Sequence, residues 1–358
     1  MPDTIDDLRI LEITPLTKPA DILAEIHRDA VVTETVTSNR DAIHKILQGE
    51  DDRLAVVIGP CSIHDPVAAR EYAARLQEQR QRFSDDLEIV MRVYFEKPRT
   101  TVGWKGLIND PHLDGSYRIE EGLRIARRLL LDINAMSLPA GVEFLDTITP
   151  QYIADLVSWG AIGARTTESQ IHRQLASGLS CPIGFKNGTD GSARVALDAI
   201  LAASQPHHFP AVTKDGQAAI ASTRGNEDCH IILRGGKQPN YEAADIAAVT
   251  TEAVKLGVAP RILVDASHAN SGKDPMNQPR VVKSVAAQIA AGNSDIKGMM
   301  IESNLVAGRQ DLVPGKPLVY GQSITDGCID WDMSVAVLED LAKSARERRR
   351  TRVQSAGK

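Results

Sequence analysis

Short apolar segments recur along the chain, and each leads to a residue with a charged or metal-binding side chain. Eight of them are Leu54–Ile58, Ile89–Met91, Gly141–Val142, Ala161–Ala164, Pro182–Phe185, Ile231–Leu233, Ile262–Val264 and Met299–Ile301. Stretches with apolar residues at helical spacing separate these segments. Strands that alternate with helices form βαβ units with a parallel sheet. Eight units over roughly 250 residues predict a closed (β/α)8 barrel.

The same pattern predicts the helices and the boundaries of the chain's parts. Barrel helices are expected over residues 65–83, 117–136, 151–159, 169–176, 193–203, 242–256, 280–291 and 332–346. Residues 51–346 would form the catalytic barrel. Residues 1–50 would be an N-terminal extension for regulation or assembly, with a strand over 6–14 and helices over 18–48. Residues 347–358 would be a basic tail that ends the last helix and then frays.

One segment, at about residues 209–224, interrupts the alternation between the fifth helix and the sixth strand. Two runs with strand character flank Asp215-Gly216, a pair that favours a tight turn. We therefore expect a β-hairpin inserted before barrel strand 6. It is either a simple loop insertion or, with the N-terminal strand, a separate surface for binding or assembly.

Composition narrows the class of protein. Hydrophobic residues make up 42% of the 358, and 41 basic against 47 acidic residues give a net charge of −6, which does not favour nucleic acid. The four cysteines form no CxxC motif, so a disulfide framework is not expected. The acidic start lacks the apolar core of a signal peptide, and no apolar run is long enough to span a membrane. We expect a cytoplasmic protein.

Four residues suited to binding a transition metal follow predicted strands at the same end of the barrel. They are Cys61, His268, Glu302 and Asp326. A thiolate, an imidazole and two carboxylates suit manganese, iron, cobalt or zinc, whereas magnesium and calcium prefer oxygen ligands alone. Each residue alone has a plain structural explanation, but the shared strand-end position favours one site. His64 is a rival ligand, and Asp265 is either a further ligand or a partner of one.

A second group of residues is cationic and follows the same strand ends. It comprises Arg92, Lys97, Arg99, Arg165, Lys186 and Arg234. So many cations in one cleft would repel one another unless anions or carboxylates lay among them. Arginine and lysine both suit phosphate and carboxylate groups, so the number predicts a ligand with more than one anionic group. Gly184–Gly188 and Arg234–Gly236 would let a phosphate approach the backbone.

Taken together, several motifs resemble type I, amino-acid-regulated microbial 3-deoxy-D-arabino-heptulosonate-7-phosphate (DAHP) synthase. They are Gly59-Pro-Cys-Ser-Ile-His-Asp65, Arg92-Val-Tyr-Phe-Glu-Lys-Pro-Arg-Thr-Thr101, Gly163-Ala-Arg-Thr-Thr-Glu-Ser169, Gly184-Phe-Lys-Asn-Gly188, Leu233-Arg-Gly-Gly236, Asp265-Ala-Ser-His-Ala-Asn270 and Ile301-Glu-Ser-Asn304. The resemblance extends from about residue 6 through the last helix. It implies condensation of phosphoenolpyruvate with erythrose 4-phosphate, the first step of the shikimate pathway to aromatic amino acids.

The resemblance also implies roles for individual residues. Cys61, His268, Glu302 and Asp326 would hold one divalent metal ion, which would polarise the aldehyde carbonyl. Phosphoenolpyruvate would be surrounded by Arg92, Lys97, Glu143, Arg165, Lys186 and Arg234, and the phosphate of the aldose would be bound by Arg99 and Thr100. Lys97 is the expected proton donor or shuttle, and its cationic neighbours should lower its pKa. His268 or Asp326 would move a proton from the water.

Family members of this type are homotetramers inhibited by an aromatic amino acid. The implied inhibitor site joins Asp6 and Asp7 of one subunit to Phe144, Gln151, Leu175, Leu179, Ser180, Phe209 and Ala211 of another. The small Ala211 leaves room for a tyrosine hydroxyl but offers it no hydrogen bond, which slightly favours tyrosine over phenylalanine. The inserted hairpin and the N-terminal extension would both serve this site.

Two other functions compete with this interpretation. The related synthase that condenses phosphoenolpyruvate with arabinose 5-phosphate has a similar barrel and anion pocket, but Lys97-Pro-Arg-Thr100 and the N-terminal extension favour the heptulosonate enzyme. A non-catalytic sugar-phosphate sensor would use the same pocket. It would not need the four residues of metal-ligand type.

Overall fold

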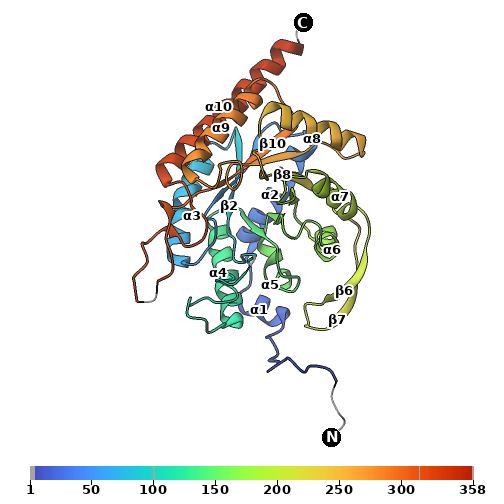
Figure 1. Cartoon of the computed structure of the whole chain (residues 1–358), viewed down its shortest axis with the longest axis vertical. Coiled ribbons are helices and arrows are strands. Elements are labelled where there is room, and N and C mark those ends of the chain that lie inside the picture. Colours follow the sequence, from blue (N-terminus) through green and yellow to red (C-terminus); the bar gives the residue numbers. More distant parts are fainter. Residues whose placement is uncertain (1–4, 100, 314, 357–358) are drawn as a thin grey trace.

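A closed barrel of eight parallel strands forms the centre of the molecule (Figure 1). The computed structural model describes residues 5–99, 101–313 and 315–356. In the order in which they pair, the strands are β1 Leu54–Gly59, β10 Ile296–Glu302, β9 Ile262–Asp265, β8 His230–Leu233, β5 Ile183–Lys186, β4 Trp159–Ile162, β3 Ala140–Glu143 and β2 Leu87–Arg92. Each of the eight predicted segments overlaps one of them, so the predicted fold class is confirmed.

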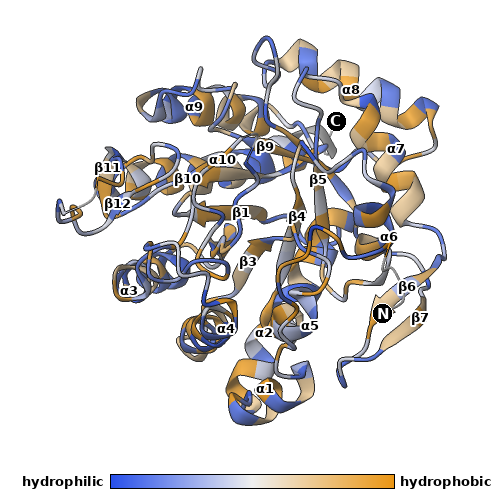
Figure 2. Cartoon of the chain, turned by 60° about the horizontal axis from the view of Figure 1, so that its bottom comes forward, coloured by the Kyte–Doolittle hydropathy of each residue, from blue (hydrophilic) through white to orange (hydrophobic). Residues whose placement is uncertain are grey.

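Helices surround the barrel and turn their apolar sides toward it (Figure 2). They are α3 Pro66–Arg82, α4 Ile119–Ala135, α5 Pro150–Ile153 with the short 3-10 helix η1 Ala154–Leu156, α6 Gln170–Gly178, α7 Arg194–Ala203, α8 Ala243–Lys255, η2 Pro275–Asn277 with α9 Gln278–Ala290, and α10 Trp331–Ala356. The helix expected over 151–159 ends early, because Trp159 already belongs to β4 and is buried inside the barrel. Its indole N–H donates a hydrogen bond to His230 Nε2 at 3.1 Å.

Helix α2 (Ala30–Gln48) closes the barrel at the end where the strands begin. Ile43 and Leu47 of this helix pack with Val57, Val90 and other side chains of the barrel interior. The Asp29 carboxylate accepts a hydrogen bond from the Val32 N–H and so caps the start of α2, and Gly49 ends the helix with a φ of 83°. With this end plugged, the open mouth lies where the strands end.

The strand expected over residues 6–14 is not formed. Residues 5–18 have no regular secondary structure before α1 (Pro19–Glu25), and Leu8, Leu11 and Ile13 expose most of their side chains. The strand predicted from the alternation of polar and apolar residues is therefore wrong. A strand needs a neighbouring strand edge, and none within the described part of this chain pairs with the segment.

The predicted hairpin is confirmed. Strands β6 (His208–Val212) and β7 (Ala218–Ser222) pair antiparallel, and Gly216 has a φ of 74° in the turn. The Lys214 carbonyl at the tip accepts a hydrogen bond from the Ala20 N–H at 2.8 Å, so the hairpin reaches α1. A second small sheet, of β11 (Val306–Arg309) and β12 (Gln322–Ser323), was not predicted; it lies in the segment between β10 and α10.

Helix α10 continues through the basic run instead of ending at residue 346. Arg349 forms ion pairs with Asp52 and Asp86 at 2.7 and 2.6 Å, and Arg348 donates a hydrogen bond to the Asp52 carbonyl at 2.6 Å. The helix thus extends past residue 347, where a fraying tail was expected to begin, and its basic run is bound to the barrel. None of the described helices combines the length and apolar character that a membrane span requires.

Candidate active site

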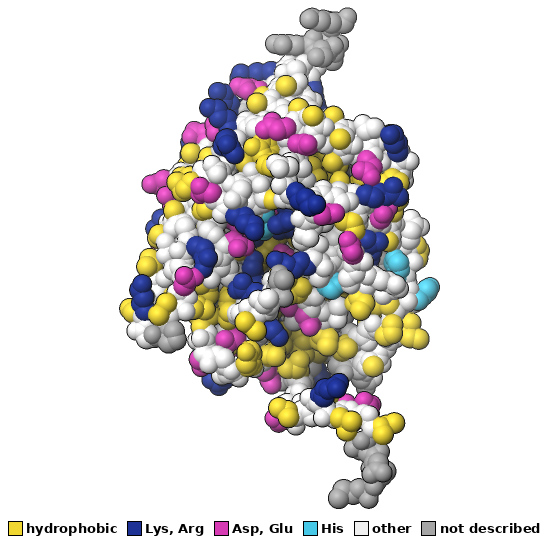
Figure 3. All heavy atoms as spheres, in the orientation of Figure 1, with side chains coloured by type: hydrophobic (Ala, Val, Ile, Leu, Met, Phe, Trp, Pro, Cys, Tyr) yellow, Lys and Arg dark blue, Asp and Glu magenta, His cyan; other side chains and the backbone are white. Residues whose placement is uncertain are grey.

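The strand ends deliver the predicted chemical groups to one mouth of the barrel. Cys61 follows β1, Lys97 follows β2 and Glu302 ends β10. His268 follows β9, and Asp326 lies in the segment between β10 and α10. In the space-filling view, Lys and Arg side chains gather near the middle of one face with acidic side chains among them (Figure 3). The convergence inferred from the sequence is thus present in the structure.

The metal-type residues form a compact group. Ligand atoms of Cys61, Glu302 and Asp326 all lie within 4.8 Å of one another, and the Cys61 thiol points to an Asp326 oxygen with Sγ–Oδ2 at 3.6 Å. Nε2 of His268 is 3.9 Å from Oε1 of Glu302. Among the described residues, no hydrogen bond or ion pair joins His64, the rival ligand, to Cys61, Glu302 or Asp326. The donor set therefore comprises one sulfur, one imidazole nitrogen and carboxylate oxygens, as a transition metal requires.

Asp265 orients His268 from the side that faces away from Glu302. Its Oδ2 lies 2.9 Å from Nδ1 of His268 and 3.4 Å from Nζ of Lys186. Burial alone would raise the pKa of Asp265, but His268 and Lys186 hold it well below its usual value. His268 also has a φ of 56°, a left-handed backbone that turns its ring toward the cluster. Asp265 therefore occupies the position of a partner to a ligand.

The pKa of Lys97 is raised, whereas the sequence predicted that it would be lowered. Its Nζ lies 3.2 Å from Sγ of Cys61 and 3.3 Å from the Cys61 carbonyl oxygen. Burial opposes the charge, but Cys61, Glu302 and Glu143 outweigh it and raise the pKa of Lys97. The prediction was wrong because it counted the cations and overlooked the anions around this amine. Burial and Glu302 raise the pKa of the Cys61 thiol to about 11.

Arg92 is completely buried and paired with the metal-type group. Its Nη2 lies 3.1 Å from Oε1 of Glu302, and its guanidinium carbon lies 3.9 Å from the centre of the Tyr94 ring. Tyr94 was missed in the sequence, although it follows Arg92 by two positions and such residues share one side of an extended chain. A stacked aromatic ring and a carboxylate together fix the guanidinium in one orientation.

The remaining residues expected at phosphoenolpyruvate also lie at this mouth. Lys186 ends β5 and Glu143 ends β3, and both are buried. Arg165 follows β4 and is exposed, whereas Arg234 follows β8 and is half-buried. Within the described residues, no hydrogen bond or ion pair joins the Arg165 or Arg234 side chain to the metal-type group.

The pair expected at the aldose phosphate is only partly described. Arg99 is exposed, and its Nε donates a hydrogen bond to the Trp104 carbonyl at 2.8 Å. Thr100 lies outside the described residues.

Comparison with known proteins relates this site to a family. The family described as "DAHP synthetase I family" matches residues 29–339. The "Phospho-2-dehydro-3-deoxyheptonate aldolase, Phe-sensitive" of Escherichia coli K12 is 61% identical over 344 residues, which is 96% of this chain and 98% of that protein. The chain belongs to the DAHP synthetase I family. It is an enzyme of that family.

Further relatives agree with this assignment. The "Phospho-2-dehydro-3-deoxyheptonate aldolase, Trp-sensitive" of Buchnera aphidicola is 53% identical, over 94% of this chain and 97% of that protein. The solved structure titled "Structure of Phospho-2-dehydro-3-deoxyheptonate aldolase from Francisella tularensis SCHU S4" superposes with a TM-score of 0.93 at 51% identity. It covers 95% of this chain and 99% of the other.

The residues expected to bind an inhibitor lie on one side of this DAHP synthetase barrel. Phe144, buried directly after β3, precedes the helix that contains Gln151. The others lie on or just after α6 and on β6, namely Leu175, Leu179, Ser180, Phe209 and Ala211. The Ser177 and Thr223 hydroxyl oxygens, 2.7 Å apart, join α6 to the hairpin. Asp6 and Asp7 are exposed on the N-terminal arm, and no described contact joins them to this group.

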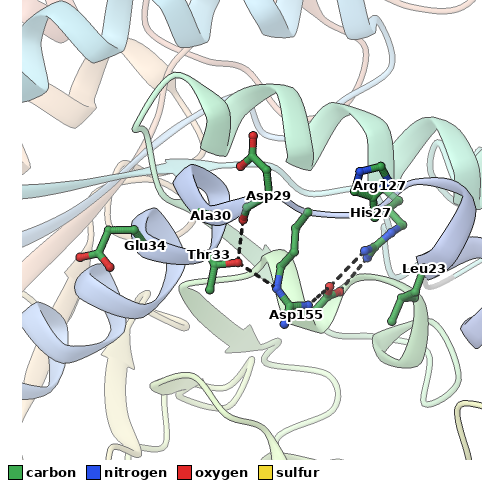
Figure 4. A pocket seen from close by; sticks show the side chains of 9 residues that line it. Leu23, His27, Asp29, Ala30, Thr33, Glu34, Arg127 and Asp155 are labelled. Carbon is green, nitrogen blue, oxygen red and sulfur yellow. Dashed lines mark hydrogen bonds and ion pairs between the residues drawn. The ribbon is translucent and has the colours of Figure 1, made fainter.

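A separate pocket lies between the α1–α2 segment and η1 (Figure 4). Arg127 and Arg28 both approach it, and each forms an ion pair with Asp155, at 2.7 and 2.8 Å. Arg127 also donates hydrogen bonds to the carbonyls of Ile26 and Tyr152, both at 2.8 Å. Because these cations are already paired, the pocket fits a structural link between the N-terminal helices and the barrel better than an active site.

Proposed function

We propose that the enzyme condenses phosphoenolpyruvate with D-erythrose 4-phosphate and water to give DAHP and phosphate, the first step of the shikimate pathway. The observation that carries this proposal is the joint arrangement at one mouth. There, the ligand atoms of Cys61, Glu302 and Asp326 lie beside the buried cations Arg92 and Lys97. Family membership supports the same reaction, because the relatives are named for this product.

The metal in this proposal is one divalent transition ion, held by Cys61, His268, Glu302 and Asp326. The donors fit such an ion, because the ligand atoms of Cys61, Glu302 and Asp326 lie within 4.8 Å of one another and Nε2 of His268 lies 3.9 Å from Oε1 of Glu302. When bound, the ion supplies Lewis acidity at the aldehyde carbonyl of the aldose. Metal analysis of the purified enzyme would distinguish manganese, iron, cobalt and zinc.

The cations of the mouth would hold the two anionic substrates. In this proposal, Arg92, Lys186, Arg165 and Arg234 bind phosphoenolpyruvate with Glu143 beside them, and Arg99 with Thr100 binds the aldose phosphate. C3 of phosphoenolpyruvate attacks the aldehyde carbon, water adds at C2, and phosphate leaves by cleavage of the C–O bond. The raised pKa of Lys97 keeps its amine protonated at neutral pH, so it serves as a proton donor. His268 or Asp326 takes a proton from the water.

Substrate specificity provides the first test. Purified enzyme should consume phosphoenolpyruvate with erythrose 4-phosphate and release an equal amount of phosphate, and a chelator should stop the reaction until a divalent ion is restored. Preference for arabinose 5-phosphate would instead indicate the related octulosonate synthase. Absence of turnover with both aldoses and each of the four ions would indicate a sugar-phosphate sensor.

The role of Lys97 can be tested separately. Lys97→Met keeps the length of the side chain but removes the proton, so kcat should fall on the order of a hundredfold or more. Because the amine it removes is buried among Cys61, Glu302 and Glu143, some stability should be lost as well, so kcat is measured at a temperature where circular dichroism shows the variant folded. A normal kcat would remove Lys97 from the proton-transfer step.

Regulation belongs to the same proposal. An aromatic amino acid would bind where the arm residues Asp6 and Asp7 of one subunit meet the α5, α6 and hairpin region of another, in a homotetramer. The room beside Ala211 favours tyrosine. The named relatives are sensitive to phenylalanine or tryptophan, so all three amino acids should be compared.

A further inference from the structure

Three asparagines from three different strand-end loops form hydrogen bonds with the backbone around Arg234. Asn187 follows β5, Asn240 lies in the loop after β8, and Asn270 lies in the loop after β9. Asn187 and Asn270 are completely buried, and Asn240 is half-buried. These loops belong to three motifs that the sequence singles out, but the roles assigned above use none of their amide groups.

Asn187 uses its whole hydrogen-bonding capacity in this arrangement. Its Oδ1 accepts from the Arg234 N–H at 2.8 Å and from Nδ2 of Asn240 at 3.2 Å. Its Nδ2 donates to the carbonyls of Gly188 at 2.8 Å and Gly235 at 3.0 Å. One amide therefore holds the backbone on both sides of the Arg234–Gly235 peptide.

Asn240 and Asn270 extend the same network to β9. Oδ1 of Asn240 accepts from the Gly235 N–H at 2.7 Å, and the Asn240 N–H donates to Oδ1 of Asn270 at 2.8 Å. Nδ2 of Asn270 then donates to the carbonyls of Leu233 at 3.0 Å and Asp265 at 2.9 Å. The network thus joins the carbonyl of the residue before Arg234 to the main-chain carbonyl of Asp265, the residue whose side chain orients His268.

The backbone of this loop is closely packed against its neighbours. A Cβ added at Gly235, whose φ is 75°, would lie 2.8 Å from Cβ of Ala269 and 2.9 Å from Oδ1 of Asn270. A Cβ at Gly236 would lie 2.2 Å from the Gly191 nitrogen. The backbone that bears Arg234 is therefore fixed by hydrogen bonds on one side and by contact on the other.

The guanidinium of Arg234, by contrast, has no hydrogen bond or ion pair to any described residue. The clamped backbone fixes the point from which this side chain extends, and no neighbouring carboxylate holds the guanidinium itself as Glu302 holds Arg92. We propose that Asn187, Asn240 and Asn270 form a clamp that aims Arg234 at the phosphate of phosphoenolpyruvate. These are positioning residues, and this inference rests on the proposed function.

The clamp predicts an effect on one substrate only. In Asn240→Ala, the link between the other two asparagines is lost at a half-buried position, so the fold should persist. The variant loses two side-chain hydrogen bonds, to the Gly235 N–H and to Oδ1 of Asn187. We expect KM for phosphoenolpyruvate to rise about threefold to tenfold, with KM for erythrose 4-phosphate and kcat changed less than about twofold. The matched control is Asn293→Ala, at the other end of the barrel, where Asn293 Oδ1 accepts from two backbone N–H groups. It should leave both KM values unchanged.

A double-variant comparison distinguishes positioning from general loosening. If the clamp acts through Arg234, Asn240→Ala should raise KM for phosphoenolpyruvate no further in an Arg234→Met background. An additive effect, an unchanged KM in Asn240→Ala, or equal increases for both substrates would overturn the proposal. Should Asn240→Ala fail to fold, Asn240→Ser is measured in its place. Wild-type enzyme that makes no DAHP would refute the proposed function itself; binding of phosphoenolpyruvate measured by calorimetry would still test the clamp.

Discussion

Buried carboxyl groups in this barrel differ in their proton affinity because their neighbours differ. Asp265 faces His268 and Lys186, and its pKa is held low. Glu96 is also buried, but its nearest charge is Asp146; burial and this second carboxylate raise the pKa of Glu96 to about 7. Its oxygens accept hydrogen bonds from the Thr149 hydroxyl at 3.0 Å and the Asp146 N–H at 3.3 Å. At neutral pH, Glu96 is therefore close to its own titration point.

The raised pKa of Glu96 predicts how stability depends on pH. Between its ordinary pKa of 4.5 and about 7, the folded protein holds a proton that the unfolded chain releases, so the free energy of unfolding falls as pH rises. Glu96→Gln removes this contribution. From pH 5 to pH 8, the variant should gain about 2 to 3 kcal/mol relative to wild type in urea unfolding. Parallel pH curves for the two proteins would contradict the assignment.

Single residues also show where sequence reasoning succeeds. Cys61, Glu302 and Asp326 could be grouped in advance because the ends of parallel strands meet at one mouth, whatever their distance along the chain. The pKa of Lys97 could not be predicted, because its sign depends on which charges lie within a few ångströms. The asparagine clamp could not be predicted either, because its three amides lie in separate loops and share no sequence spacing.

At the scale of elements, α10 holds the closed end of the barrel together. Its residues Arg346 and Arg349 both pair with Asp86, whose side chain is only 7% exposed, and Arg349 also reaches Asp52. A carboxylate this buried needs its cations, since burying an unpaired charge is unfavourable. The basic run thus has a structural purpose at the point where the chain was expected to fray.

Removing one of these cations should weaken the fold measurably. Arg349→Ala leaves Asp86 with a single, half-exposed partner, so the free energy of unfolding should fall by about 1 to 2 kcal/mol. The control is Arg350→Ala, one position further along at an exposed site. It should stay within about 0.5 kcal/mol of wild type in the same denaturant titration. Equal losses in both variants would show that the helix, not the ion pair, was affected.

Elements that depend on residues close together in the sequence were predicted well. Short continuous apolar runs predicted the eight barrel strands, apolar residues at helical spacing predicted most helices, and Asp215-Gly216 predicted the hairpin. The segment 6–14 has the alternation of a strand but no strand beside it within the described chain. The predicted end of α10 was also wrong, because contacts with Asp52 and Asp86, far away in sequence, stabilise further helical turns.

At the scale of the whole molecule, the N-terminal arm (residues 5–18) leaves large apolar side chains exposed to solvent within one chain. Leu8, Leu11 and Ile13 are exposed by 74%, 103% and 73%, as expected for a segment that packs against another subunit. In the proposed tetramer, this arm brings Asp7 to the inhibitor site of its neighbour. Asp7→Asn removes the charge but suits the φ of 58° at this position. It should raise the inhibition constant of the aromatic amino acid about tenfold or more, with kcat unchanged.

The matched control for the arm is Glu12→Gln, an exposed acidic residue on the same segment that is not expected at the site. It should be inhibited like wild type. Inhibition curves of all three proteins with phenylalanine, tyrosine and tryptophan test the site and identify the inhibitor together. Unchanged inhibition of Asp7→Asn would remove the arm from the regulatory site.

Metal content and activity, measured together on wild type and Cys61→Ala, test the central claim most directly. Metal-stripped wild-type enzyme should be inactive, and one divalent ion per chain should restore DAHP formation. Cys61→Ala should keep the circular dichroism of wild type yet neither retain the ion nor recover activity. A Cys61→Ala enzyme that binds one ion per chain and turns over normally would contradict the account, because the thiol would then not belong to the site on which catalysis depends.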